Sequence, residues 1–272
     1  KKPDAITKAY FMELTNQQKY WITGATSGIG RALCIELAQL EHKLIISSRN
    51  AEELGKLALE YPKLIQILPC DVSNNEEMAE LFSTKMPTLK NLDGIFLCAG
   101  VCEYIDLPKF NLDAFQKAVA INYLGTVNSC AAAYPLLSNS VSDMPNKKPF
   151  IAGLCSMSSY LGFPRAEAYG ASKAAMAYFL NSLRADIGDK IDVIPVYLGF
   201  VKTPMTAQND FPMPFLISPE EAARGILNKL TKRPLRINLP WRLHAVLGTF
   251  SKLQRLWYQT IIPRMRRSRN VT

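Results

Sequence analysis

A tyrosine and a lysine stand four residues apart in the run YGASK, as Tyr169 and Lys173, within a stretch that has the pattern of a helix. Side chains at positions i and i+4 share one face of a helix, so the phenol and the ammonium can point into one cleft. A phenol ordinarily has a pKa of about 10, and a neighbouring cation lowers that pKa by favouring the phenolate. Tyr169 is therefore suited to exchange a proton with a substrate oxygen. The competing interpretation is an ordinary helix, in which this spacing is common.

A glycine-rich stretch, TGATSGIG, lies between the apolar residues YWI and the helix-like run RALCIELAQL. Residues without a Cβ let the phosphates of a ligand approach the backbone, and the following helix offers free N–H groups and a partial positive charge. The alternative is a tight turn that caps a helix. We interpret the stretch as a dinucleotide cradle, with its contacts at Gly24, Thr26, Ser27, Gly28, Ile29 and Gly30.

The second apolar run ends at Ser48 and Arg49. An acidic residue at this place would bond the ribose hydroxyls of the adenosine and repel a 2′-phosphate, whereas a guanidinium suits a phosphate. The pair therefore favours NADP(H) over NAD(H) as the cofactor. The alternative is a surface arginine at the end of a strand.

Two further strand ends offer cofactor contacts. Asp71, followed by Val72, places a carboxylate where it can accept from the adenine amino group. Cys98, Ala99 and Gly100 are small enough to let the backbone pass close to a cofactor. Either group is also compatible with ordinary strand-end chemistry.

These residues need a scaffold, and the chain alternates buried-strand patterns with helical patterns. Near-continuous apolar runs are typical of parallel strands that are covered on both faces. The predicted strands are 43–49, 64–72, 92–100, 149–156 and 191–199, and the predicted helices are 31–40, 51–61, 75–86, 113–137 and 168–187. With right-handed crossovers this order predicts an α/β fold, a Rossmann-type doubly wound parallel sheet with helices on both faces. Residues 138–149 are predicted to be a polar loop.

Composition limits the class of protein. The chain has 272 residues, of which 48% are hydrophobic, which suits one large α/β domain. We expect an N-terminal extension (1–17), a Rossmann-fold domain (18–233) and a basic amphipathic tail (234–272). No apolar run reaches the length of about 18 residues that spans a membrane, so we expect a cytoplasmic protein. The six cysteines form no CxxC pair and there are two histidines, so we expect free thiols and no metal site.

Several of these motifs follow one another in a particular order: a glycine turn, Asn122 in a helix, Ser156 at a strand end, and YxxxK. In order and spacing they resemble the short-chain dehydrogenase/reductase family, over roughly residues 18–230. The resemblance implies that Ser156 steadies the substrate oxygen and that Tyr169 is the proton donor or acceptor. It also implies that Lys173 lowers the tyrosine pKa and holds the nicotinamide ribose, and that Asn122 supports a proton-relay water.

The resemblance continues through Gly199, Val201 and Thr203, where the family's threonine commonly bonds the nicotinamide carboxamide. Leu198 stands where the family usually has proline. The resemblance also implies an NADP-preferring member of the family that works as a homodimer or homotetramer.

Cys98 and Cys155 replace the asparagine and the serine that are usual in the family, without removing a catalytic group. Ser158 and Ser159 are rival serines whose spacing to the tyrosine fits the family less well.

The substrate and the tail are less specific. The segment 204–218 is rich in Pro, Met and Phe, which suits a mobile lid over an apolar pocket and equally suits core packing. We expect a small hydrophobic carbonyl or alcohol substrate, such as a keto-lipid, a keto-acyl group or a steroid-like ketone. Residues 222–272 contain twelve Lys and Arg and no Asp or Glu, whereas the whole chain has a net charge of +9.

Apolar residues recur at helical spacing in this tail. A helix on an anionic membrane surface through residues 241–269 is one interpretation, which would make the protein peripheral on the inner face of the membrane. A helix that covers its own domain or a dimer partner is the other. Nucleic acid is not an expected partner, because no stacking platform accompanies the basic residues.

Three functions remain open on sequence alone. The first is an NADPH-dependent carbonyl reductase, favoured by the complete Asn, Ser, Tyr and Lys set. The second is an alcohol dehydrogenase that uses NAD⁺, against which Ser48 and Arg49 argue. The third is a catalytically silent NADP-binding sensor or membrane adaptor, which the substitutions Cys98 and Leu198 keep open.

Overall fold

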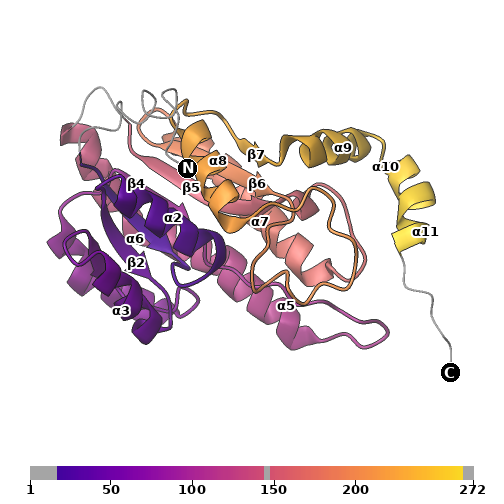
Figure 1. Ribbon diagram of the computed structural model, residues 1–272, viewed down its shortest axis with the longest axis horizontal. Coiled ribbons are helices and arrows are strands. Elements are labelled where there is room, and N and C mark those ends of the chain that lie inside the picture. The colour runs from indigo at the N-terminus through magenta and orange to yellow at the C-terminus, as the bar shows by residue number, and fades with distance from the viewer. Residues whose placement is uncertain (1–16, 144–147, 266–272) are drawn as a thin grey trace.

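The protein is built around one parallel β-sheet, as a computed structural model that describes residues 17–143 and 148–265 shows (Figure 1). Seven strands lie in the order β3-β2-β1-β4-β5-β6-β7. Their bounds are β1 Lys19–Thr23, β2 Lys43–Ser47, β3 Ile65–Ile67, β4 Gly94–Leu97, β5 Phe150–Ser156, β6 Asp192–Leu198 and β7 Ile237–Leu239. The predicted doubly wound parallel sheet is therefore confirmed.

The strand order reverses between β1 and β4. β1 pairs in parallel with β2 on one side and with β4 on the other. The first half of the chain therefore extends the sheet on one side of β1, and the second half extends it on the other side. Ligands of open α/β sheets bind at the carboxyl ends of the strands beside such a reversal. The topology thus places a site after Thr23 and Leu97.

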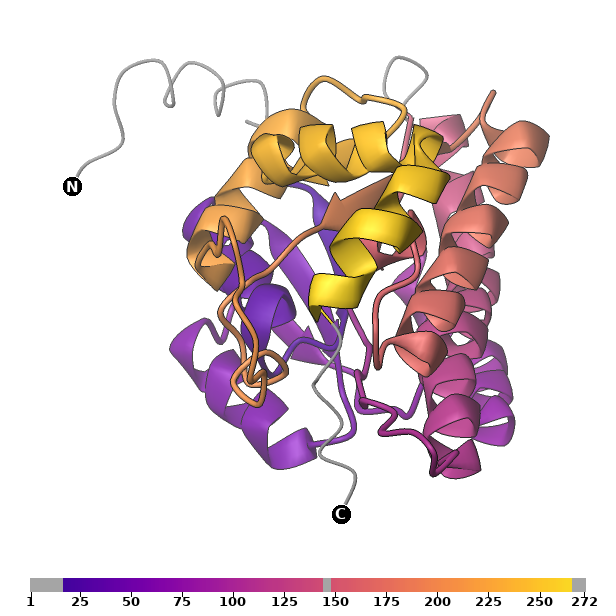
Figure 2. The same cartoon turned by 90° about the vertical axis from the view of Figure 1, so that its right-hand side faces the viewer.

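Helices cover both faces of the sheet (Figure 2). One apolar cluster joins the sheet to α2, α3 and α8, and a second joins it to α4, α6 and α7. The bounds are α2 Gly28–Gln39, α3 Ala51–Glu60, α4 Asn75–Glu80, α5 Leu112–Ala118, α6 Gly125–Asp143, α7 Glu167–Ile187 and α8 Pro219–Leu230. Short turns of other helix types are η1 Leu81–Lys85, η2 Met86–Leu89, η3 Val119–Leu124 and η4 Met157–Ser159.

Three local features differ from the sequence prediction. The predicted helix 113–137 is interrupted by the π-helical turn η3, and α6 then continues to Asp143, so 138–143 are helical and not a loop. A seventh strand, β7, lies within the segment assigned to the tail, because it pairs with β6 at the sheet edge. Three residues are too few to show a strand pattern, so only pairing reveals it.

The tail is helical but broken. It consists of α9 Trp241–Lys252, α10 Gln254–Leu256, η5 Trp257–Ile261 and α11 Ile262–Met265, and residues 266–269 of the predicted surface lie outside the described residues. Leu243, Leu247, Trp257 and Ile262 are buried in the core cluster that contains α7. One side of the tail therefore covers its own domain. In the described part of the chain, no helix has the length and apolar character needed to cross a membrane.

A capping box begins α8, and we expect it to stabilise the fold measurably. The Ser218 hydroxyl accepts from the Glu221 N–H, and the Glu221 carboxylate accepts from the Ser218 N–H. Replacing such a cap by alanine costs about 1 kcal/mol. Ser218→Ala should lower the free energy of unfolding in urea by that amount. Thr249→Ala, which removes an exposed hydroxyl within α9, is the control and should change it by less than about 0.5 kcal/mol; equal effects would contradict the capping role.

Candidate active site

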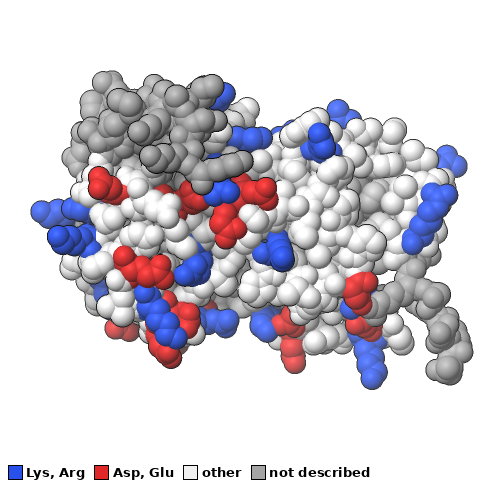
Figure 3. All heavy atoms as spheres, viewed as in Figure 1, with Lys and Arg blue, Asp and Glu red and all other residues white. Residues whose placement is uncertain are grey.

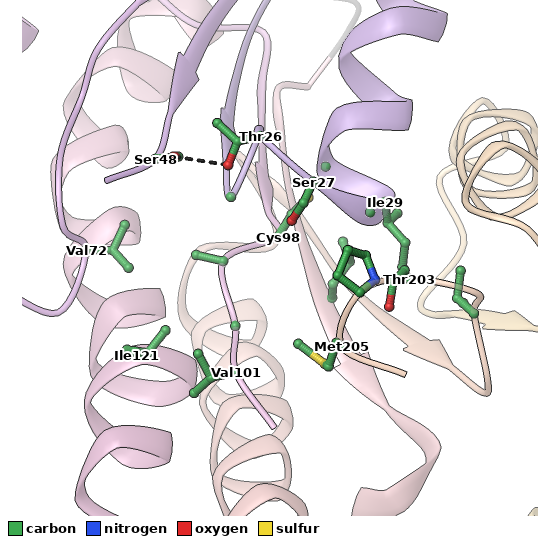
Figure 4. A pocket seen from close by; sticks show the side chains of 18 of the residues that line it. Thr26, Ser27, Ile29, Ser48, Val72, Cys98, Val101, Ile121, Thr203 and Met205 are labelled. Carbon is green, nitrogen blue, oxygen red and sulfur yellow. Dashed lines mark hydrogen bonds between the residues drawn. The ribbon is translucent and has the colours of Figure 1, made fainter. Parts of the chain in front are cut away.

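A cavity of about 390 Å³ opens at the carboxyl ends of the strands (Figure 4). Its wall combines the β1–α2 turn, the residues after β2, β3 and β4, the end of β5, the start of α7 and the segment after β6. Every residue predicted to contact a cofactor lies on this wall: Gly24, Thr26, Ser27, Gly28, Ile29, Gly30, Ser48, Arg49, Asp71, Val72, Cys98, Ala99, Gly100, Tyr169, Lys173, Gly199, Val201 and Thr203. Of the four predicted catalytic residues, Tyr169 and Lys173 line it, whereas Ser156 and Asn122 are not among its lining residues.

The glycine turn leaves no room for side chains. Gly24 has φ +65°, and a Cβ there would lie 2.7 Å from the backbone nitrogen of Ala99. A Cβ at Gly30 would lie 2.2 Å from the carbonyl oxygen of Gly24. Ser27 precedes α2 without capping it through its side chain, and the first turn of α2 carries no acidic residue. The N–H groups and the positive end of α2 are therefore available to a phosphate.

The end of β2 forms a small polar network with the glycine turn. Thr26 donates to the Ser48 hydroxyl over 3.1 Å, which is drawn in Figure 4, and Ser48 accepts from the backbone N–H of Asn50 over 3.0 Å. Arg49 is exposed beside them on the cavity wall. Within the described residues no carboxylate forms an ion pair with Arg49. Its guanidinium is therefore open to an anion from solution.

Asp71 has a local partner. Its Oδ1 accepts from the backbone N–H of Ser73 over 2.9 Å and from the Ser73 hydroxyl over 2.6 Å. This turn holds the carboxylate at the cavity wall and leaves Oδ2 free of those two bonds. The adenine contact expected for Asp71 stays a prediction.

Ser156 ends β5 and is held by its neighbours. Its hydroxyl oxygen accepts from the N–H of Ser158 over 3.1 Å and from the Ser158 hydroxyl over 2.9 Å. Ser159 donates to the carbonyl oxygen of Ser156. The Ser156 side chain also interacts with Tyr169, and this interaction opposes the rise in the pKa of the tyrosine. The two rival serines are thus both hydrogen-bonded to Ser156, and the choice of Ser156 as the catalytic serine stays a prediction.

Asn122 lies fully buried in the π-helical turn η3. Its amide donates to Val101 O and to the Ser172 hydroxyl, each over 2.9 Å, and its Oδ1 accepts from Val101 N over 2.8 Å. Ser172 in turn donates to the carbonyl oxygen of Tyr169. Asn122 therefore ties the segment after β4 to α7. A Cβ on Gly100 would lie 3.1 Å from Asn122 Oδ1 and 3.4 Å from Lys173 Nζ, so this glycine lets the two elements meet.

Burial controls the titration of the central pair. It raises the pKa of Tyr169, with nearby Cys102 adding to the effect and the Ser156 hydrogen bond opposing it. Burial also lowers the pKa of Lys173, whose ammonium donates to Leu154 O over 2.7 Å. The sequence argument expected a lowered tyrosine pKa. In the folded protein the pKa of Tyr169 is raised instead, because burial desolvates the phenolate.

Thiols surround this pair. Cys98 and Cys155 line the cavity, and burial raises their pKa values to about 12. The pKa of Cys102 is raised to about 11 by the same cause. All three are free cysteines and uncharged at neutral pH. Cys98 and Cys155 therefore act as small, weakly polar wall residues.

Several other wall residues were not predicted as cofactor contacts, and most of them adjoin a predicted one. They are Ser47, Asn50, Cys70, Val101, Ile121, Leu154, Cys155, Leu198, Pro204, Met205 and Thr206. Thr206 has a structural role: it donates to Val201 O over 2.6 Å and accepts from Thr203 N over 3.0 Å. Ile121 was detectable as the neighbour of Asn122. Met205 and Thr206 belong to the segment 204–218, whose Pro-, Met- and Phe-rich composition was the sequence signal for a place beside the pocket.

An ion-pair cluster fastens that segment beside the cavity. Arg165 bonds Asp106 over 2.7 Å and Asp210 over 3.1 Å, and its guanidinium lies 4.8 Å from the ring centroid of Tyr104. The Tyr104 hydroxyl donates to Asn209 over 2.5 Å. Arg165 thereby joins the segment after β4, the loop before α7 and the segment after β6.

Comparisons with known proteins agree with this geometry. Residues 18–212 match the family model described as short chain dehydrogenase. The chain is 27% identical over 226 residues to an uncharacterized oxidoreductase of Myxococcus xanthus, covering 82% of this chain and 87% of that protein. An uncharacterized oxidoreductase of Staphylococcus haemolyticus is 28% identical over 220 residues, or 80% of this chain and 92% of that protein.

Solved structures share the fold. A short chain dehydrogenase from Burkholderia cenocepacia, in complex with NADP, has a TM-score of 0.76 at 21% identity and covers 90% of this chain and 98% of that chain. A short-chain dehydrogenase from Streptomyces avermitilis has a TM-score of 0.71 at 18% identity, with coverages of 90% and 99%.

The close approach at the glycine turn yields a stability test. Gly30→Ala must displace the backbone of Gly24, so we expect the free energy of unfolding in urea to fall by about 1–3 kcal/mol. Gly55 lies inside α3, where nothing stands within 4 Å of the place that a Cβ would take, and Gly55→Ala is the matched control. The control should stabilise the protein by up to about 1 kcal/mol. A Gly30→Ala protein as stable as the wild type would contradict the tight contact.

Proposed function

Because the chain belongs to the short-chain dehydrogenase family, we propose that it is an NADP(H)-dependent oxidoreductase acting on a carbonyl or hydroxyl group of a hydrophobic substrate. The observation that carries this proposal is the arrangement of Tyr169 and Lys173 on the cavity wall, with Ser156 bonded to the tyrosine. A proton donor and a second hydrogen-bond donor beside a nucleotide cradle are what carbonyl reduction requires.

The residues of the cavity suit a dinucleotide. The glycine turn excludes Cβ atoms where a pyrophosphate would approach, and the start of α2 offers N–H groups without a competing carboxylate. Arg49, exposed and without an ion pair among the described residues, suits a 2′-phosphate together with Ser48. The NADP complex of the Burkholderia cenocepacia structure supports the same choice of cofactor. When bound, the nicotinamide supplies or accepts the hydride.

In the proposed reduction, Tyr169 donates a proton to the substrate oxygen and Ser156 donates a hydrogen bond to the same oxygen. The raised pKa of Tyr169 keeps its proton in place at neutral pH, which suits a donor. Lys173, which donates to Leu154 O, bonds a ribose hydroxyl in this proposal and stabilises the phenolate that remains after proton transfer. Asn122 holds α7 against the segment after β4 and so positions the tyrosine.

The surroundings of the cavity support a hydrophobic substrate. Tyr104 and Phe211 meet edge to face with centroids 5.8 Å apart, and Phe200 lies 6.1 Å from Phe211. Met205 lines the cavity next to the residues that follow β6 (Figure 4). Aromatic and thioether side chains favour apolar ligands. Keto-lipids, keto-acyl groups and steroid-like ketones fit this description.

The cofactor preference can be measured by titration with NADPH and NADH, following the fluorescence of the reduced nicotinamide. The wild type should bind NADPH more tightly. Arg49→Gln should weaken NADPH binding by about 10–100-fold, the value of a charge-assisted hydrogen bond, and leave the Kd for NADH within about twofold. Lys63→Gln removes an exposed charge just before the amino end of β3, away from the cavity wall, and is the control. Equal loss of both cofactors in Arg49→Gln would contradict the phosphate contact.

The catalytic role of Tyr169 can be tested with NADPH and three candidate substrates: a long-chain ketone, a 3-oxoacyl thioester and a steroid ketone. Tyr169→Phe should lower kcat by about 10²–10⁴-fold while the Kd for NADPH stays within about twofold. A proton donor works below its pKa, and burial raises the pKa of Tyr169, so reductive kcat should stay level from about pH 6 to about pH 8.

An active Tyr169→Phe enzyme would refute the assignment. A different result would be a wild type that binds NADPH, turns over none of the three carbonyl compounds, and changes its Kd for NADPH when one of them is added. That result would support a sensor.

A further inference from the structure

The tail helices have two faces with different surroundings. Four apolar side chains of α9–α11 are buried against the domain, but others point outward. Trp241 is 65% exposed and Leu253 is 50% exposed. We define the tail face by its exposed basic and large apolar residues: Trp241, Arg242, Val246, Lys252, Leu253, Arg255, Leu256, Tyr258, Arg264 and Met265. The apolar side chains of the tail face are therefore not needed to cover the core of the domain.

The charge of the tail face has one sign. Arg242, Lys252, Arg255 and Arg264 are exposed on it, and the sequence has no Asp or Glu from residue 222 onward. Figure 3 shows basic side chains among uncharged ones over α9 and α10, with no acidic side chain there, whereas both signs mix over α2 and α3. None of the four forms an ion pair with a described carboxylate. The face therefore complements a negatively charged surface.

We propose that the tail face docks on an anionic membrane surface. Exposed aliphatic and aromatic side chains can enter the boundary between headgroups and acyl chains, while arginine and lysine next to them bind lipid phosphates. Trp241, with the Arg242 guanidinium 5.7 Å from its ring centroid, has the amphipathic character that favours this depth. The lysine and arginine stems add apolar contact while their charges stay at the headgroups.

A second copy of the chain fits this face less well. A two-fold interface brings the same patch of both copies together, so basic side chains would face basic side chains without a compensating carboxylate. Nucleic acid would satisfy the charge but not the exposed Val246, Leu253, Leu256 and Met265. Protein surfaces that bind nucleic acid are polar, and aliphatic side chains gain little beside phosphates.

The domain holds the tail face firmly. The Trp257 indole donates to Gly162 O over 3.0 Å, and the Tyr258 hydroxyl accepts from Gly162 N over 3.1 Å. The Trp257 ring also packs on Phe163, with centroids 5.2 Å apart. Gly162 belongs to the loop that connects Ser156 with Tyr169, so the tail contacts the segment between two of the proposed catalytic residues.

Cosedimentation of the full chain with phosphatidylcholine vesicles, with and without phosphatidylglycerol, tests the proposal. The wild type should bind the phosphatidylglycerol vesicles at least about tenfold more strongly. A variant with Arg242→Gln, Lys252→Gln, Arg255→Gln and Arg264→Gln should lose that binding. The matched control carries Lys43→Gln, Lys63→Gln, Lys90→Gln and Lys190→Gln, all exposed and at or before the amino ends of strands, and should bind as the wild type does.

Tryptophan fluorescence gives a second readout. Trp21 and Trp257 are buried, so Trp241 is the tryptophan that can change its surroundings on docking. The emission of the wild type should move to shorter wavelength with phosphatidylglycerol vesicles. Trp241→Phe should still sediment with them but lose the shift. Sedimentation without a shift in the wild type would overturn the assignment of the docking face.

Other outcomes would also overturn the proposal. They are failure of the wild type to bind either vesicle, equal binding by the tail variant, and binding by the tail face to a single-stranded oligonucleotide in place of vesicles. A change of molar mass between wild type and tail variant in light scattering would assign the face to a second copy. NADPH titration of the same proteins separates this result from the proposed function, because none of the four tail residues lines the cavity.

Discussion

The contact between the β1–α2 turn and the segment after β4 is a backbone packing contact, and the site depends on it. Gly24 meets Ala99, and Gly30 meets the carbonyl of Gly24, at distances that no Cβ would allow. The start of α2 lines the cavity, and the Ser27 side chain does not cap its N–H groups. The reversal of strand order beside β1 creates the crevice, and these glycines keep it open.

Desolvation sets the chemistry of the other end of the cavity. Lys173 is almost completely buried, and hydrogen bonds from Ser156 and through Ser172 hold Tyr169 and its helix. Asn122 can serve this network because the helix widens to a π-turn at its position. Neutral thiols at 98, 102 and 155 add no charge to the surroundings, so the balance between phenol and phenolate rests on burial and on a few hydrogen bonds.

The tail links this interior to the outer surface. Trp257 and Leu243 reach inward, and Leu243 occupies the space that a side chain on Gly199 would need. The break after α9, at Leu253, lets the following residues turn so that Trp257 meets Gly162. One short segment thereby closes the edge of the core and presents basic and apolar side chains outward. Packing on the domain is a property of its inner face, and the proposed membrane contact belongs to its outer face.

The sequence by itself determined the features that depend on local spacing: the alternation of strands and helices, the glycine turn before α2, and the strand ends that supply Ser48, Asp71 and Cys98. These follow from periodicity and from the residue types that a sharp turn tolerates. Only the tertiary structure decided that Asn122 is fully buried, that β7 joins the sheet, and that burial raises the pKa of Tyr169. Each of these depends on neighbours distant in the chain, because pairing and desolvation are properties of the packed molecule.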